Sequence, residues 1–306
     1  MSKLNGSAEM PGRREFIVSA GRGVGALFVA PTCLAAAHNS APLEITVQQV
    51  IDTILRDIPQ SPFAKTVDVL VSGSAHQPVS GIVTTMFPTI EVIHATAQAG
   101  ANLIIAHETP FYNHQDETSW LQEDPVYREK VRLLEKYKIA IWRFHDHWHR
   151  AIPDGIIMGN LIRVGWEGYY DPNSPRLINL PEAVSLGALI SHVKKGLRAQ
   201  QVRVIGAMDQ PCQSVYMAFG FMDSKMQIEA IRQYQPDVIL SGETREWETV
   251  ERVRDGKALG ANTSLVVLGH EVSEDAGMAY AAQWISERIL GVSVTHVPSG
   301  DPFLFL

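Results

Sequence analysis

Residues 265–274 read Leu-Val-Val-Leu-Gly-His-Glu-Val-Ser-Glu, an apolar strand pattern that gives way to a helix pattern. On a helix, residues four apart lie on the same face, so the side chains of His270 and Glu274 can reach one point in space. An imidazole and a carboxylate placed in this way are suitable ligands for a metal ion. The stretch therefore predicts a strand–helix unit of an α/β fold with a pair of candidate metal ligands where the strand ends. The structural alternative for Glu274 is compensation of the helix dipole.

Two other predicted strands end in side chains of the same kind. Residues 103–108 read Leu-Ile-Ile-Ala-His-Glu, and residues 139–149 read Ile-Ala-Ile-Trp-Arg-Phe-His-Asp-His-Trp-His. Residues two apart share a face of an extended strand, which predicts that His145 and His149 point the same way. Three strand ends with ligand-type residues indicate one shared metal site. Its candidate ligands are His107, Glu108, His145, His149, His270 and Glu274. The alternative for His107 is a hydrogen-bonded histidine at a strand end, and Glu108 could instead point into the loop after its strand. His145 could instead support a ligand from outside the metal's own contacts.

Strand patterns alternate with helix patterns along most of the chain. The predicted strands are 67–71, 81–85, the two runs that end at His107 and His145, 202–207, 215–220, 238–241, the run that ends at His270, and 292–297. The predicted helices are 46–55, 89–99, 125–137, 154–164, 181–196, 225–235, 246–256 and 274–289. This alternation is typical of βαβ units, and it predicts mainly parallel sheets flanked by helices.

A turn-rich stretch, Tyr170-Asp171-Pro172-Asn173-Ser174-Pro175, divides this pattern. We expect one α/β half over residues 38–170 and a second over residues 171–306. In open α/β sheets the functional site lies beyond the carboxyl ends of the strands. Because His107, His149 and His270 all lie at such ends, in both halves, the predicted site is in the cleft between the halves.

Residues 1–37 have the features of an export signal. Arg13-Arg14 precedes a mildly apolar stretch that closes on Leu34-Ala35-Ala36-Ala37, a pattern typical of a cleavage site. The arginine pair resembles a twin-arginine signal and predicts a periplasmic protein. The alternative is a disordered or partly helical N-terminal tail.

Charge and cysteine content narrow the class of protein further. The chain has a formal net charge of −7. Nonspecific nucleic-acid binding needs a basic surface, so we do not expect this protein to bind nucleic acid. No run of about 20 uninterrupted apolar residues exists, so stable membrane insertion after signal cleavage is not expected. Of the two cysteines, Cys33 leaves with the signal, and Cys212 then has no partner for a disulfide. No phosphate-binding loop follows a predicted strand, and no Gly-x-Ser-x-Gly motif occurs.

Taken in order, four short motifs resemble those of the Nif-three-like dinuclear-metal family. They are Ile104-Ile105-Ala106-His107, the strand end at His145, Ser241-Gly242-Glu243, and Gly269-His270 followed by Glu274. Many members of that family carry the label GTP cyclohydrolase I type 2 homologue, and the resemblance extends from about residue 46 to residue 303. It implies two α/β domains, a two-metal site between them and assembly into a homohexamer.

This chain departs from the family pattern at two of the implied ligands. Glu108 stands where the family has a histidine, and His149 stands where it has an aspartate. The two exchanges leave the set of imidazoles and carboxylates unchanged, which favours a retained metal site. Glu243 matches the family's Ser-Gly-Glu motif and is the candidate catalytic residue, as a general base.

Three functions are consistent with these residues. The first is a metal-dependent hydrolase that activates a metal-bound water, with two divalent transition-metal ions, since Zn, Fe and Mn all accept mixed nitrogen and oxygen ligands. The second is a non-catalytic metal-binding or metal-handling protein. The third is a regulatory interaction protein, as the resemblance also implies. The substrate is a small molecule that the sequence does not identify.

Overall fold

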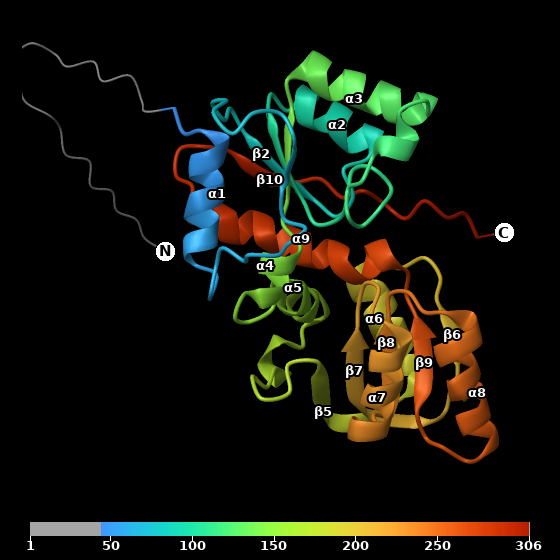
Figure 1. Ribbon diagram of the computed structural model, residues 1–306. Coiled ribbons are helices and arrows are strands. Elements are labelled where there is room, and N and C mark those ends of the chain that lie inside the picture. Colours follow the sequence, from blue (N-terminus) through green and yellow to red (C-terminus); the bar gives the residue numbers. More distant parts are fainter. Residues whose placement is uncertain (1–43, 306) are drawn as a thin grey trace, which may run out of the picture. The chain divides into compact units, whose positions relative to one another are not determined.

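The computed structural model describes residues 44–305, which contain two five-stranded sheets and the helices packed against them (Figure 1). The predicted export signal at residues 1–37 lies outside the described residues. The first sheet has the order β1-β4-β3-β2-β10, and the second has the order β5-β7-β8-β9-β6. The predicted α/β class with helix-flanked sheets is therefore confirmed.

The first sheet places two of the predicted strand ends side by side. It comprises β1 (Leu70–Ser72), β2 (Ile82–Thr85), β3 (Leu103–Ala106), β4 (Ala140–Arg143) and β10 (Val294–His296). All neighbouring pairs are parallel except β1 with β4. Ala106 at the end of β3 pairs with Arg143 at the end of β4, so the chain segments that follow these strands leave the sheet together. β10, near the end of the chain, completes this first sheet.

The second sheet has parallel central strands and antiparallel edges. It comprises β5 (Leu177–Ser185), β6 (Arg203–Ile205), β7 (Pro211–Ala218), β8 (Val238–Ser241) and β9 (Ser264–Val267). The prediction of a helix over residues 181–196 was wrong at its start. Residues up to Ser185 continue β5, because their backbone pairs with β7 as far as Pro211. Ser185 then caps the helix that follows, accepting a hydrogen bond from the Ala188 amide.

Nine α-helices connect the strands within the described residues. They are α1 (Val47–Arg56), α2 (Ile90–Gln98), α3 (Pro125–Tyr137), α4 (Asp146–Arg150), α5 (Gly155–Val164), α6 (Leu186–Leu197), α7 (Ser224–Tyr234), α8 (Glu251–Ala258) and α9 (His270–Ser286). Short 3-10 turns cover Ser119–Leu121 and Glu167–Tyr169, and a π-helical turn, Glu246–Val250, leads into α8. α9 begins at His270 rather than at Glu274, so both residues of the predicted ligand pair lie on it.

Helix α9 packs against both sheets and belongs to two hydrophobic cores. Met278 and Ile285 pack with residues of the first sheet, in a core to which α1 also contributes. Val272 and Ala276 pack with residues of the second sheet, together with α5 and α6. α2 and α3 cover the other face of the first sheet, and α7 and α8 cover the other face of the second. Packing against both sheets therefore fixes the place of α9 in the fold (Figure 1).

Helices α5 and α9 approach each other closely through glycines. A Cβ atom at Gly159 of α5 would lie 2.5 Å from the Ala276 carbonyl oxygen and 2.6 Å from the Gly277 Cα atom. Both of these atoms belong to the backbone of α9. Because α9 carries His270 and Glu274, this contact fixes the position of the candidate ligands.

We expect Gly159→Ala to lower the free energy of unfolding by about 1–3 kcal/mol, because the added methyl group must separate two packed helices. Because the atoms that the methyl group meets belong to the backbone, the cost should be near the top of this range, so a net loss of about 2 kcal/mol remains after the roughly 1 kcal/mol that alanine gains over glycine within a helix. Chemical denaturation measures the change. Gly168→Ala is the control, since nothing lies within 4 Å of its Cβ position. Equal stability of the two variants would contradict a glycine-dependent contact.

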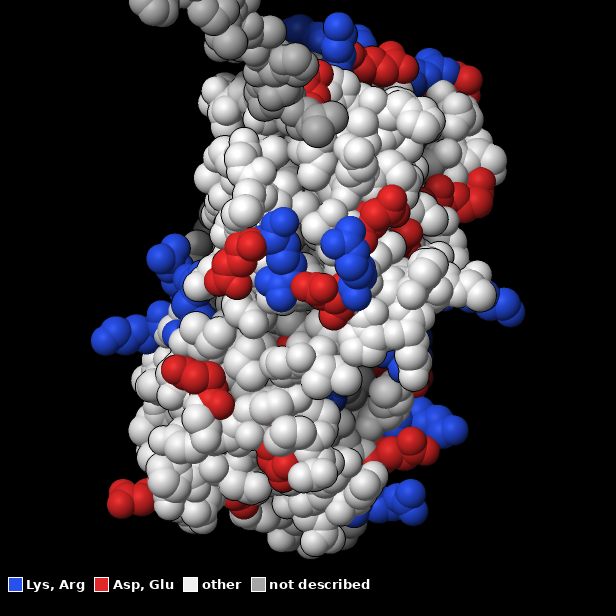
Figure 2. Space-filling model, turned by 90° about the vertical axis from the view of Figure 1, so that its left-hand side faces the viewer, with Lys and Arg blue, Asp and Glu red and all other residues white. Residues whose placement is uncertain are grey.

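Acidic and basic side chains are interspersed on the face of the molecule that Figure 2 shows. One exposed ion pair links the ends of α1 and α9, where Arg288 donates to Asp57 at 2.7 Å. Exposed pairs of this kind contribute only about 0–1 kcal/mol each.

Among the described residues, no helix has both the length and the apolar character needed to cross a membrane.

Candidate metal centre

The segment after β4 turns into a helix, which corrects the prediction of a continuous strand through residue 149. β4 ends at Arg143, and α4 starts at Asp146. The buried carboxylate of Asp68 accepts hydrogen bonds from the backbone amides of His145, Asp146 and His147, at 2.8–2.9 Å. These are the amides that the start of a helix leaves without partners, so Asp68 stabilises the helical turn.

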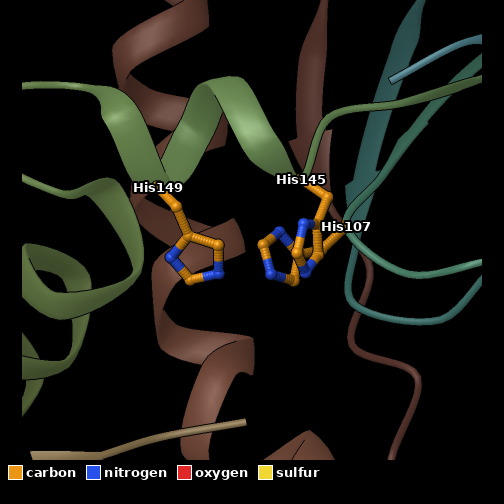
Figure 3. Close-up of side chains that lie close together, drawn as sticks. All are labelled: His107, His145 and His149. Atoms are coloured by element: carbon orange, nitrogen blue, oxygen red, sulfur yellow. The ribbon is translucent and has the colours of Figure 1, made fainter. Parts of the chain in front are cut away.

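The short helix α4 brings His145 and His149 together, because they are four residues apart. The side chains of His145, the residue that precedes α4, and of His149 both project toward His107, which follows β3 (Figure 3). The ring centroids of His107 and His145 are 4.6 Å apart, and those of His107 and His149 are 5.0 Å apart. His147 points elsewhere: it stacks on Phe63, and its Nδ1 atom lies 2.6 Å from Asp68. The prediction that residues two apart share a face therefore fails here.

All six predicted ligands lie in two groups of three. His107, His145 and His149 form the first group, and Glu108, His270 and Glu274 form the second. Within each group, one ligand atom per residue lies within 4.8 Å of the others. Either group can hold a metal ion.

The two carboxylates of the second group also face the imidazoles of the first. Glu274 Oε2 lies 3.1 Å from His270 Nε2 and 3.5 Å from His107 Nε2, while its Oε1 lies 4.0 Å from His149 Nε2. Glu108 Oε1 lies 3.6 Å from His145 Nε2 and 3.7 Å from His270 Nε2. Each carboxylate thus stands between the two groups, which is the arrangement that bridging ligands require.

All four imidazoles use Nδ1 for an outer hydrogen bond and direct Nε2 into the cluster. The Nδ1 partners are the Phe144 carbonyl for His107, Asp146 for His145, Asp154 for His149 and Glu243 for His270, at distances of 2.7–3.2 Å. Metal-binding histidines characteristically donate their second ring N–H to a carbonyl or carboxylate in this way. The pattern fixes the orientation of each ring.

The buried environment of His107 fits a cation. Its Nε2 atom is fully buried and makes no hydrogen bond, although Glu274 Oε2 lies 3.5 Å away. Burial lowers the pKa of His107 well below its ordinary value, and the neighbouring His145 and His149 lower it further. A neutral ring whose Nδ1 donates to Phe144 presents a lone pair at Nε2. Two electron-rich atoms then face each other in a buried site, and a cation between them would relieve their repulsion.

The other imidazoles differ in their protonation. Burial lowers the pKa of His145, with a further contribution from His149. Burial also acts to lower the pKa of His149, but the charge and hydrogen bond of Asp154 outweigh it and raise the value. For His270, hydrogen bonds to Glu243 and Glu274 overcome the effect of burial and raise the pKa to about 10. Because a ligand imidazole must be neutral at Nε2, metal binding would release a proton from His270.

Sequence reasoning missed several residues that support the ligands. Buried Arg143 donates to Glu108 Oε2 at 2.7 Å, which leaves Oε1 directed at the imidazoles. Asp154 caps α5 through Oδ1 and holds His149 through Oδ2. Gly220 follows β7 with a φ of +62°, and a Cβ atom there would lie 2.1 Å from Glu274 Oε1. These contacts join residues far apart in the chain, so no local pattern reveals them.

Glu243, the predicted catalytic residue, lies beside the cluster as an outer partner of His270. Its Oε1 atom is 2.7 Å from His270 Nδ1, and about half of its side chain is exposed. The hydrogen bond to His270 lowers the pKa of Glu243. The geometry therefore indicates that Glu243 orients the His270 ring. Its role as a general base stays a prediction.

Replacing Asp154 by asparagine should weaken metal binding roughly 10–100-fold, because loss of an outer carboxylate partner frees the His149 ring. Asparagine is also a good N-cap, so α5 and the fold should persist. Isothermal titration with Zn²⁺ measures the affinity. Asp171→Asn, in the turn after Tyr170, is the matched control and should bind as the wild type does. Unchanged affinity in Asp154→Asn would exclude a role for this contact.

The structure has two sheets flanked by helices, and six imidazole and carboxylate side chains converge in one cluster. These features define the chain as an α/β protein with a candidate metal centre. The model of the family Duf34/NIF3 (NGG1p interacting factor 3) matches residues 45–302. The chain therefore belongs to the Duf34/NIF3 family, as the resemblance in its motifs predicted.

Solved structures show the same fold. Protein SA1388 of Staphylococcus aureus is 17% identical, with a TM-score of 0.68, over 86% of this chain and 100% of that chain. A Bacillus cereus protein related to NIF3 is also 17% identical, with a TM-score of 0.67 and the same coverage. Reduced HcgD from Methanocaldococcus jannaschii is 15% identical, with a TM-score of 0.59, over 82% of this chain and 97% of that chain. No curated protein matches the sequence.

Proposed function

We propose that this protein is a metal-dependent hydrolase with two divalent transition-metal ions, Zn, Fe or Mn, at the cluster. The observation that carries the proposal is the shared orientation of four imidazoles, each held at Nδ1 and directed inward at Nε2. His107, His145 and His149 would hold one ion, and His270 would hold the other. Glu108 and Glu274 stand where they would bridge the two.

Divalent ions in such a site act as Lewis acids and lower the pKa of a coordinated water toward neutrality. The surrounding residues of the chain prepare the site for this chemistry. Arg143 fixes Glu108, and Asp154 and Glu243 keep the Nδ1 protons of His149 and His270 on the outer side of the rings. The ligands are thus oriented before any ion or substrate binds, which limits reorganisation during the reaction.

Hydrolysis assays with protein loaded with Zn, Mn or Fe test the proposal. The substrate panel comprises phosphoesters, nucleotides and cyclic amides, and Glu274→Gln serves as the inactive control. Turnover of one class by the wild type, absent in the variant, supports a hydrolase. Full metal occupancy without turnover of any class would contradict it and favour a metal-holding protein.

Assembly and export are further parts of this proposal. A homohexamer, which size-exclusion chromatography with light scattering tests, rests on the family resemblance. A periplasmic location rests on Arg13 and Arg14 before an apolar stretch.

We expect the double substitution Arg13→Lys, Arg14→Lys to leave the precursor in the cytoplasm, because the twin-arginine machinery recognises the guanidinium pair rather than positive charge alone. Cell fractionation and N-terminal sequencing measure the outcome, with the wild type expected to begin at His38. A wild-type protein found intact in the cytoplasm would reject the signal.

A further inference from the structure

A cavity of about 1090 Å³ adjoins the candidate metal centre, and two residues connect it to the cluster. His270 and its hydrogen-bonded partner Glu243 both line it. Its volume is slightly above the range for small-molecule sites, which is roughly 300–1,000 Å³. A molecule in this cavity would therefore lie next to one of the proposed ligands.

The last described residues of the chain form one wall of the cavity. The backbone amide of Gly300 donates to Glu271 Oε1 at 3.0 Å, and the amide of Phe87 donates to Ser299 Oγ at 3.4 Å. These bonds attach the tail to the first turn of α9 and to the loop before α2. Residues 301–305 then run along the cavity.

Apolar side chains supply much of the lining. Phe87 packs edge-on against the His270 ring, with centroids 5.7 Å apart, and Leu268 and Val272 continue this surface. The tail also contributes Phe303 to the lining, and this residue is 67% exposed. Aromatic rings that line a concave site and remain open to solvent are suited to cover an apolar or aromatic group.

The charges of the lining have an acidic excess. Glu243, Glu271 and Asp301 are acidic, whereas the basic side chains of the lining are Arg203 and His270, and His270 is paired with Glu243 and Glu274. The guanidinium of Arg203 is paired with Glu246. Arginine and lysine are the side chains best suited to bind phosphate, and the described lining residues include no unpaired arginine or lysine.

We propose that this cavity binds an apolar or aromatic part of the substrate that is neutral or cationic, and that it disfavours anionic groups such as phosphate. The proposal rests on the proposed hydrolase function and deepens it. Within the panel above, it favours cyclic amides over phosphoesters and nucleotides.

Four matched aromatic probes test the charge preference on metal-loaded, full-length protein: 2-phenylacetamide, phenethylamine, phenylacetate and phenyl phosphate. Ligand-observed NMR measures their dissociation constants. We expect the neutral and cationic probes to bind and Phe303→Ala to weaken both by roughly threefold to tenfold, as loss of an aromatic contact does. Asp301→Asn should weaken phenethylamine and leave 2-phenylacetamide unchanged.

The controls separate this cavity from other modes of binding. Leu290→Ala removes another exposed apolar side chain, outside the cavity lining, and should change nothing. Anionic probes that coordinate the metal directly should be insensitive to Phe303→Ala. Absence of binding by the neutral and cationic probes, no effect of Phe303→Ala on them, or tighter Phe303-dependent binding of phenyl phosphate would each overturn the proposal. Because these measurements need no turnover, the hydrolase proposal and the cavity proposal can fail separately.

Discussion

Glu274→Gln should lower the affinity for divalent metal by roughly 100-fold or more. Loss of a residue that only hydrogen-bonds to a ligand costs roughly 10–100-fold, and Glu274 is itself a proposed ligand. Glu274 is 2% exposed, and its two oxygens face the Nε2 atoms of His107, His149 and His270. Glutamine has the same shape but no charge, so it cannot bridge two cations. Isothermal titration with Zn²⁺ and elemental analysis measure the loss.

A graded control separates a ligand from its supporting residues. Glu243→Gln changes the outer partner of His270, so its loss of affinity should be smaller, roughly 10–100-fold. The metal-dependent rise in melting temperature should disappear in Glu274→Gln and be retained in part in Glu243→Gln. Equal metal content in Glu274→Gln and wild type would show that Glu274 is not a ligand.

Gly220→Ala should abolish tight metal binding although it changes no proposed ligand. The added Cβ atom would lie 2.1 Å from Glu274 Oε1, and the flexible carboxylate end is the part that can move. Glu274 would then leave its place between the two groups of ligands. The φ of +62° adds a backbone strain of about 1–2 kcal/mol. Metal titration and chemical denaturation measure the two effects separately.

Gly165→Ala is the matched control for Gly220→Ala. Gly165 ends α5 with a φ of +72°, and nothing lies within 4 Å of its Cβ position. It should show the backbone strain alone, with a similar loss of stability and normal metal binding. If both variants bound metal equally well, Gly220 would have no role in placing Glu274.

The convergence of the six candidate ligands was predictable because its signals are local. His270 and Glu274 lie four residues apart on one helix, and His107 and Glu108 directly follow an apolar run. The parallel pairing of β3 and β4 then brings the neighbouring strand ends together, as the alternation of strands and helices predicted.

The supporting residues could not be predicted, because they depend on contacts between distant parts of the chain. Asp68 stabilises the start of α4 although it lies about eighty residues earlier in the chain. Without that contact, the alternating histidines follow the pattern of a strand. The antiparallel pairing of β5 with β7 likewise overrode a local helix pattern at residues 181–185. Gly220 has a role only because Glu274 lies against it.

Anomalous X-ray diffraction from crystals of the metal-reconstituted protein tests the central claim most directly. With Zn²⁺, we predict anomalous peaks at about 2.0–2.2 Å from the Nε2 atoms of His107 and His270 and from an oxygen of Glu274. Elemental analysis of the same protein should give about one to two equivalents of metal. Peaks only at other places, or less than about 0.2 equivalents after reconstitution with Zn, Mn and Fe, would contradict a metal centre at this cluster.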